Sequence, residues 1–386
     1  MNYISKIASN YPASGIRAMF ELAKQYDDLI NLCIGEPNFE TPDFIKESAD
    51  KAIKEGFTHY VSNAGMLELR QAIAGKYKKE FGYECTVDNV QVAIGGTEAN
   101  FLTLMTIINP GDEVIVTNPC YPNYLGQIML AGGKVVEVPI YEENQFKLQP
   151  EDLEKAITSK TRAIFLNSPN NPVGFALTKK DIEALAEVIK KHNLIVISDE
   201  VYEKIYYDGN THFSMSQIPE VREKVIIINS FSKTYAMTGW RIGYIIGDKK
   251  IISKMPAMQE GIVSCVPSFI QKAAVDAING PQEDTERMLV DYARRRDILI
   301  DGLNRIPGIK CIKSPGTFYA FPNIKSFGKK SVDFALELLK EAGVVSVPGS
   351  AFGSMGEGYL RFSFANSDEN LREGVCRIAE YVKKNY

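Results

Sequence analysis

A repeating alternation of short β-branched segments and helical segments between residues 90 and 199 limits the folds open to this chain. Apolar runs with the length and composition of buried strands occur at 90–94, 114–116, 134–138, 163–166 and 194–198. Segments between them show helical spacing of apolar residues, and parallel neighbouring strands need such crossovers. The pattern therefore predicts an α/β fold in which a mostly parallel sheet is sandwiched by helices.

The character of the sequence changes after about residue 282. A long amphipathic helix is predicted at 283–305, followed by short strands, a helix at 331–342, a strand at 359–364 and a closing helix at 368–384. Strands and helices segregated in this way indicate a smaller α+β domain. A chain of 386 residues is also longer than one hydrophobic core usually fills.

We expect three parts from these segments. Residues 1–15 form a polar N-terminal arm, residues 16–42 pack with 283–386 as the small α+β domain, and residues 43–282 form the large domain. Within the N-terminal segment, Thr41 is expected to cap a helix that begins at the following proline.

Composition argues against several classes of function. The net charge is −4 without a long block of like charge, so a nucleic-acid-binding surface is not expected. The six cysteines are scattered and the three histidines lack metal-ligand spacing, which favours free thiols and no metal site. No apolar run reaches the length of a membrane span. We therefore expect a cytoplasmic protein without nucleic-acid or membrane partners.

One loop between two predicted buried strands carries two cations. The strand at 225–228 leads into Ser230 and Lys233, and Arg241 precedes the next strand. Unpaired cations are costly in such a place, so both residues need chemical partners. We hypothesise that Lys233 forms a Schiff base and that Arg241 holds a phosphate. The alternatives are a solvated loop lysine and a surface salt bridge.

Polar residues also follow the carboxyl ends of the predicted strands, where ligands bind in sheets of this kind. Gly96 and Thr97 open a helix whose N-terminus suits an anion, although glycines are common in such turns. Asp199 ends a buried strand, and a protonated ring nitrogen or a helix cap would satisfy its carboxylate. Asn171 and Tyr202 are placed to donate to a phenolate-like oxygen.

Two further residues are candidates for ligand contacts. Tyr121 lies between two prolines and either stacks on a planar ring or packs within its loop. Arg361 lies in an apolar strand between Leu360 and Phe362, where it needs a carboxylate from a ligand or from an internal salt bridge.

Taken in order along the chain, these motifs resemble those of the fold-type I pyridoxal 5'-phosphate (PLP) aminotransferases, class I, in the aspartate and aromatic aminotransferase group. The matching fragments span nearly the whole chain, at residues 34–39, 60–65, 95–99, 118–122, 168–174, 198–202, 230–233 with 239–241, and 360–363. Each fragment is common alone, whereas eight in the family's order are not a chance match.

The resemblance implies a role for each matched residue. The implied catalytic residues are Lys233, which carries the cofactor as a Schiff base and acts as the base, Asp199, which pairs with the pyridine nitrogen, and Tyr202. The implied cofactor contacts are completed by Asn171 and Tyr202 at the ring's 3′ oxygen, Tyr121 on the ring face, Gly96, Thr97, Ser230 and Arg241 at the phosphate, and Tyr60 from a partner subunit. Substrate binding is implied for Arg361 at the α-carboxylate, with Gly35 and Asn171 beside it.

The expected function is transfer of an amino group from an L-amino acid to a 2-oxo acid, with 2-oxoglutarate as acceptor, by a ping-pong mechanism in a homodimer with shared active sites. Residues 259–267 contain no arginine, whereas the aspartate-specific enzymes have one in the comparable region for the distal carboxylate. Strict aspartate specificity is therefore not expected. Arg17 is a possible substitute, and aromatic, other neutral and long acidic donors remain open.

Three other functions compete with this hypothesis. A PLP-dependent C–S β-lyase shares most cofactor contacts. A non-enzymatic PLP-binding regulator is disfavoured because no helix-turn-helix or basic stretch occurs within residues 1–40 and because Lys233, Asp199 and Arg361 are all present. A nucleotide-dependent oxidoreductase lacks its G-x-G-x-x-G motif after the first strand.

Overall fold

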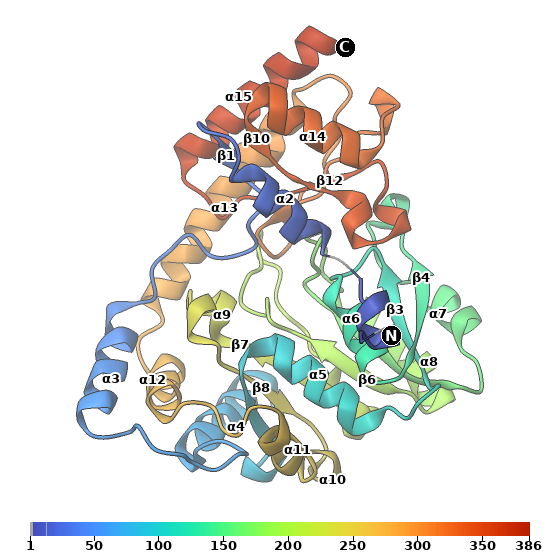
Figure 1. The fold of residues 1–386 in the computed structure, drawn as a ribbon. Helices are drawn as coiled ribbons and strands as arrows, with labels where there is room; N and C mark the ends of the chain where they lie inside the picture. Colours follow the sequence, from blue (N-terminus) through green and yellow to red (C-terminus); the bar gives the residue numbers. More distant parts are fainter. Residues whose placement is uncertain (1–2, 13) are drawn as a thin grey trace.

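The computed structural model describes residues 3–12 and 14–386 (Figure 1). Its main sheet has seven strands in the order β2-β8-β7-β6-β5-β3-β4. Strand β8 pairs antiparallel with both neighbours, and the remaining pairs are parallel. The strands are β2 Val90–Ala93, β3 Glu113–Asn118, β4 Lys134–Pro139, β5 Thr161–Asn167, β6 Ile195–Asp199, β7 Val225–Ser230 and β8 Gly243–Ile246. The predicted mostly parallel sheet is confirmed.

Helices cover both faces of this sheet. Strand β7 shows why, because Ile226 and Ile228 point into one hydrophobic core and Ile227 into the other. The first core is completed by α5 (Gly95–Ile107), α6 (Asn123–Leu130), α10 (Lys249–Ile252) and α11 (Met255–Ile262). Helices α4 (Leu67–Phe81), α7 (Pro150–Ala156), α8 (Lys179–His192) and α12 (Ser268–Asn279) contribute to the second core. The strands are therefore buried on both sides, as their continuous apolar sequence requires.

A smaller α+β part lies above the main sheet in Figure 1 and takes its strands from both ends of the chain. Strand β1 (Ile30–Asn31) pairs parallel with β10 (Val344–Val345). An antiparallel sheet combines β11 (Val347–Pro348), β12 (Leu360–Ser363) and β9 (Tyr319–Ala320). The helices of this region are α2 (Gly15–Ala23), α13 (Glu283–Asn304), α14 (Ser331–Ala342) and α15 (Asp368–Asn385). The domain boundaries given above stay a prediction.

Two local predictions need correction. Thr41 does not cap helix α3 (Asp43–Lys54), because its hydroxyl donates to the carbonyl oxygen of Ala236 at 2.6 Å and accepts from the indole N–H of Trp240 at 3.0 Å. Thr41 thereby ties the start of α3 to the segment that follows β7. That segment is not an irregular loop, since it begins with the short helix α9 (Phe231–Thr234).

The predicted N-terminal arm contains the short exposed helix α1 (Lys6–Asn10), and its residues 1, 2 and 13 lie outside the described residues. All six cysteines are unbonded. Among the described helices, none has the length and apolar character needed to cross a membrane. In the same part of the chain, no group of three His, Cys, Asp or Glu side chains is arranged to hold a metal ion.

Candidate active site

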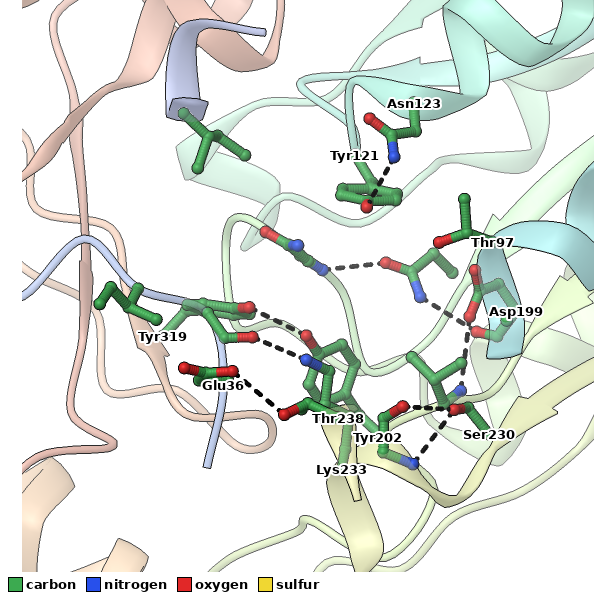
Figure 2. A pocket seen from close by; sticks show the side chains of 18 of the residues that line it. Glu36, Thr97, Tyr121, Asn123, Asp199, Tyr202, Ser230, Lys233, Thr238 and Tyr319 are labelled. Atoms are coloured by element: carbon green, nitrogen blue, oxygen red, sulfur yellow. Dashed lines mark hydrogen bonds between the residues drawn. The ribbon is translucent and has the colours of Figure 1, made fainter. Parts of the chain in front are cut away.

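A cavity of about 550 Å³ opens at the carboxyl ends of the parallel strands (Figure 2). Its walls come from the main sheet, from β9 and β12 of the smaller part, and from helix α2. The lining includes all but one of the residues predicted from sequence, namely Gly35, Gly96, Thr97, Tyr121, Asn171, Asp199, Tyr202, Ser230, Lys233, Arg241 and Arg361. The exception is Tyr60, whose side chain is exposed to solvent outside the cavity.

Lys233 enters the cavity from α9, directly after the buried strand β7. Its Nζ donates a hydrogen bond to the carbonyl oxygen of Gly35 at 2.6 Å. Burial lowers the pKa of Lys233 to about 8, because removal from water disfavours the ammonium form; Glu36 opposes this shift, and Arg361 and Arg241 add to it. About one tenth of the amines are then neutral at pH 7, compared with about one in a few thousand for an ordinary lysine. The amine is therefore suited to act as a nucleophile or a base.

Asp199 ends strand β6 and is nearly fully buried. Asn100 and Tyr124 donate to its Oδ2 at 3.0 and 2.7 Å, whereas Oδ1 accepts only a long contact of 3.4 Å from the backbone N–H of Val201. Burial raises the pKa of Asp199, and the two side-chain donors oppose that shift. No cationic side chain of the described residues pairs with it. The second oxygen is thus available to a protonated nitrogen of a ligand.

A cup for an anion forms where helix α5 begins. The N-cap residue Ile94 provides no side-chain cap, so the first N–H groups of the helix are open to a ligand. Gly95 has φ +76°, and a Cβ there would lie 2.7 Å from the guanidinium of Arg241. The Ser230 and Ser232 hydroxyls lie 2.9 Å apart at the end of β7. Glycine backbone, hydroxyls and a guanidinium are the groups that bind phosphate.

Arg361 lies in β12 with only 1% of its surface exposed. Its terminal nitrogens donate to Oδ1 of Asn171 at 3.1 Å and to the carbonyl oxygen of Cys33 at 2.6 Å, and its Nε is buried without a partner. The internal salt bridge that sequence left open is not formed, since no carboxylate of the described residues pairs with it. A buried guanidinium with neutral partners is a site for a ligand carboxylate.

Some residues of the cavity were not found from sequence. Asn100 follows Thr97 by nearly one helical turn of α5, so helical spacing could have indicated it. Tyr319 comes from the short strand β9, and its hydroxyl lies 2.9 Å from that of Tyr202. A Cβ on Gly35 would lie 2.4 Å from the Tyr319 hydroxyl, which explains glycine there. No local signal marks Tyr319, because only the tertiary fold brings it to the cavity.

Comparisons with known proteins agree with this geometry. The family model described as aminotransferase class I and II matches residues 27–378. The chain is 42% identical to the aromatic-amino-acid aminotransferase 2 of Thermococcus litoralis and 43% identical to the aspartate aminotransferase of Pyrococcus abyssi, with 96% of each chain covered in both cases. Among solved structures, the aspartate aminotransferase of Thermus thermophilus with maleate superposes with a TM-score of 0.94 at 37% identity, covering 99% of this chain and 100% of that one.

Proposed function

The chain belongs to the aminotransferase class I and II family and is a transaminase, and we propose that it uses PLP to move an amino group from an L-amino acid to 2-oxoglutarate. The observation that supports this proposal is a set of ionisable side chains whose hydrogen-bond partners are all neutral groups, since none of them forms an ion pair with another described residue. A carboxylate (Asp199), an amine of lowered pKa (Lys233) and a buried guanidinium (Arg361) share one cavity with an anion cup.

The residues present fit PLP. Oδ1 of Asp199, which has one long contact only, suits the protonated ring nitrogen, and the cup at Gly96, Thr97, Ser230 and Arg241 suits the phosphate. Lys233 is the one lysine in the described lining, and it suits the aldehyde. Asn171 and Tyr202 would contact the ring hydroxyl, and Tyr121 would face the ring.

The reaction follows from the positions of these side chains. When bound, PLP supplies an electron-withdrawing ring that stabilises the negative charge left at the amino acid's Cα. Arg361 binds the α-carboxylate and thereby orients the Cα–H bond toward Nζ of Lys233. The neutral amine of Lys233 accepts this proton and later donates it back within the same site. Asp199 holds a proton on the ring nitrogen through its negative charge.

The lowered pKa of Lys233 predicts the pH dependence of cofactor uptake. Only the neutral amine attacks an aldehyde, so uptake of PLP by the cofactor-free protein should become faster as pH rises and level off above a midpoint near pH 8. Stopped-flow absorbance measures the rate between pH 6 and 10. A rate that still rises steeply above pH 10, as for an unperturbed lysine, would contradict the assigned environment.

The part of the cavity lining that comes from helix α2 supports a broad range of amino-acid donors. Helix α2 contributes Ile16 and Phe20, one helical turn apart, and Ile34 lies nearby in the lining. Arg17 also lines the cavity, but it pairs with Glu21 at 2.9 Å and 73% of its side chain is exposed. We expect kcat/KM for phenylalanine within about 200-fold of that for aspartate, since a few apolar contacts discriminate by roughly 1–3 kcal/mol. A screen of donors with 2-oxoglutarate tests this, and a preference for aspartate above a thousandfold would contradict it.

The same assay separates transamination from C–S β-lyase activity. A transaminase without a 2-oxo acid stops after one turnover, and parallel double-reciprocal plots with both substrates indicate the ping-pong order. Continuous release of pyruvate and ammonia from a cysteine conjugate, without any acceptor, would instead show a lyase.

The proposal includes a cytoplasmic homodimer with shared active sites. Tyr60 is 88% exposed and lies outside the cavity of its own chain, which supports a role in the site of a second copy. Leu67 and Ile262 are also large apolar side chains with high exposure. Sedimentation at micromolar concentration should give twice the mass of the 43.0 kDa chain.

A further inference from the structure

The turn after strand β6 carries a second set of polar side chains that face away from the cavity. Asp199 and Tyr202 line the cavity, whereas Glu200 and Glu203 do not. Both glutamates are nevertheless buried, with 1% and 6% of their surfaces exposed. Glu203 pairs with the buried ammonium of Lys76. Asp199 and Tyr202 are thus each followed directly by a buried glutamate whose side chain lies outside the cavity.

Glu200 is fully held by a network beneath the site. Its Oε1 accepts from the hydroxyls of Ser198 at 2.8 Å and Ser214 at 2.6 Å, and its Oε2 contacts Nε2 of His212 at 2.9 Å. The backbone N–H of Glu200 donates to the carbonyl oxygen of Ile228 at 2.9 Å. The peptide that links Asp199 to Glu200 is therefore fixed by bonds to both the side chain and the backbone of Glu200.

The stability of the folded protein does not by itself explain why the Glu200 carboxylate is buried in this network. Burying a carboxylate costs desolvation that its partners roughly offset, and apolar residues of similar volume often serve as well. A connected polar network does, however, fix one geometry when all its members are satisfied. Both carboxylate oxygens of Glu200 have partners, whereas Oδ1 of neighbouring Asp199 has one long contact. The hydrogen bonds that hold Glu200 therefore also fix the position of Asp199, whose Oδ1 is left for a ligand.

We infer that Glu200 is a positioning residue for Asp199, which it orients through the clamped turn and whose affinity for a ring proton it increases through its negative charge. This inference rests on the proposed function, in which Asp199 meets the ring nitrogen of PLP. Glu200 itself touches neither cofactor nor substrate. Its charge is also among the causes that raise the pKa of Asp199, after the larger effect of burial.

The test compares binding of PLP with binding of an analogue in which a CH group replaces the ring nitrogen. Wild-type protein, stripped of cofactor, should bind PLP about tenfold or more tightly than the analogue, because a hydrogen bond to a charged group is lost. Glu200→Gln keeps the size of the side chain and is expected to lower this preference about tenfold, with analogue binding changed less than twofold. Glu142→Gln is the matched control, because Glu142 accepts hydrogen bonds from Asn323 and Tyr359 and does not line the cavity.

The outcomes separate the two claims. Equal weakening of both ligands by Glu200→Gln would show a structural role only and overturn the inference, as would an unchanged preference. A wild-type protein without any preference would overturn the Asp199 assignment in the proposed function. If the glutamine variant does not fold, Ser214→Ala removes one donor to Glu200 while keeping its charge, and it should lower the preference about threefold. An unchanged preference in that variant would equally overturn the inference.

Discussion

Replacement of Lys233 with alanine is expected to lower the rate of transamination by at least about a thousandfold. General base catalysis alone contributes roughly 10²–10⁴ in rate, and the described cavity lining contains no second lysine to replace the amine. The variant should fold normally, because the amine donates a single direct hydrogen bond, to the carbonyl oxygen of Gly35. The measurement is the initial rate with a donor and 2-oxoglutarate, together with thermal unfolding.

Removal of an exposed lysine is the matched control for the Lys233→Ala variant. Lys134 is exposed on strand β4 and does not line the cavity, so Lys134→Ala should retain activity within about twofold. A Lys233→Ala protein that keeps full activity would refute the whole mechanism. A variant that unfolds well below the wild-type temperature would show that the lysine stabilises the fold.

Replacement of Arg361 with methionine is also expected to have a large effect. It should lower kcat/KM without lowering the stability of the folded protein. Loss of a buried partner for a carboxylate costs about 2–5 kcal/mol, so kcat/KM should fall by roughly 30-fold to 5,000-fold. Stability should not fall, because the guanidinium is buried with neutral partners and an unpaired Nε. The shorter, apolar methionine removes this uncompensated charge beside the rings of Tyr319 and Phe352, which now face the guanidinium.

Two measurements on the Arg361→Met variant test this role of Arg361. Unfolding temperature should stay equal or rise, and a 2-oxo acid that stabilises the wild-type protein should no longer stabilise the variant. Arg294→Met is a useful contrast, because Arg294 forms exposed ion pairs with Asp291 and Asp368 and lies outside the cavity. It should leave kcat/KM unchanged. A fall in kcat/KM of less than threefold for Arg361→Met would contradict the assigned role.

The sheet and most of the cavity were predictable from sequence for a physical reason. Strands such as Val225–Ser230 are buried on both faces and are therefore apolar throughout, so polar residues at their ends stand out. In a parallel sheet those ends lie along one edge, which is why Asp199, Ser230 and Asn171 meet. The residue types at these positions then limited the chemistry to an amine, an anion cup and a carboxylate.

The parts that sequence did not predict depend on contacts between distant segments. Tyr124 reaches Asp199 from α6, and Tyr319 reaches Tyr202 from a two-residue strand, without any periodic signal. Thr41 had the sequence context of a helix cap, but a hydrogen bond across 195 positions to Ala236 competes for its hydroxyl. The sequence also could not show that Arg361 lacks an internal ion pair, because it does not reveal which carboxylates lie near the guanidinium in the fold.

Lys233 is the residue that we propose joins this chain to its cofactor. Borohydride reduction of the PLP-loaded protein converts the lysine–cofactor link into a stable amine, and mass spectrometry of the digested protein then locates it. We predict one modified residue, Lys233, whose amine has a pKa lowered to about 8 by burial. Modification at a different lysine, or no stable adduct at all, would contradict the account.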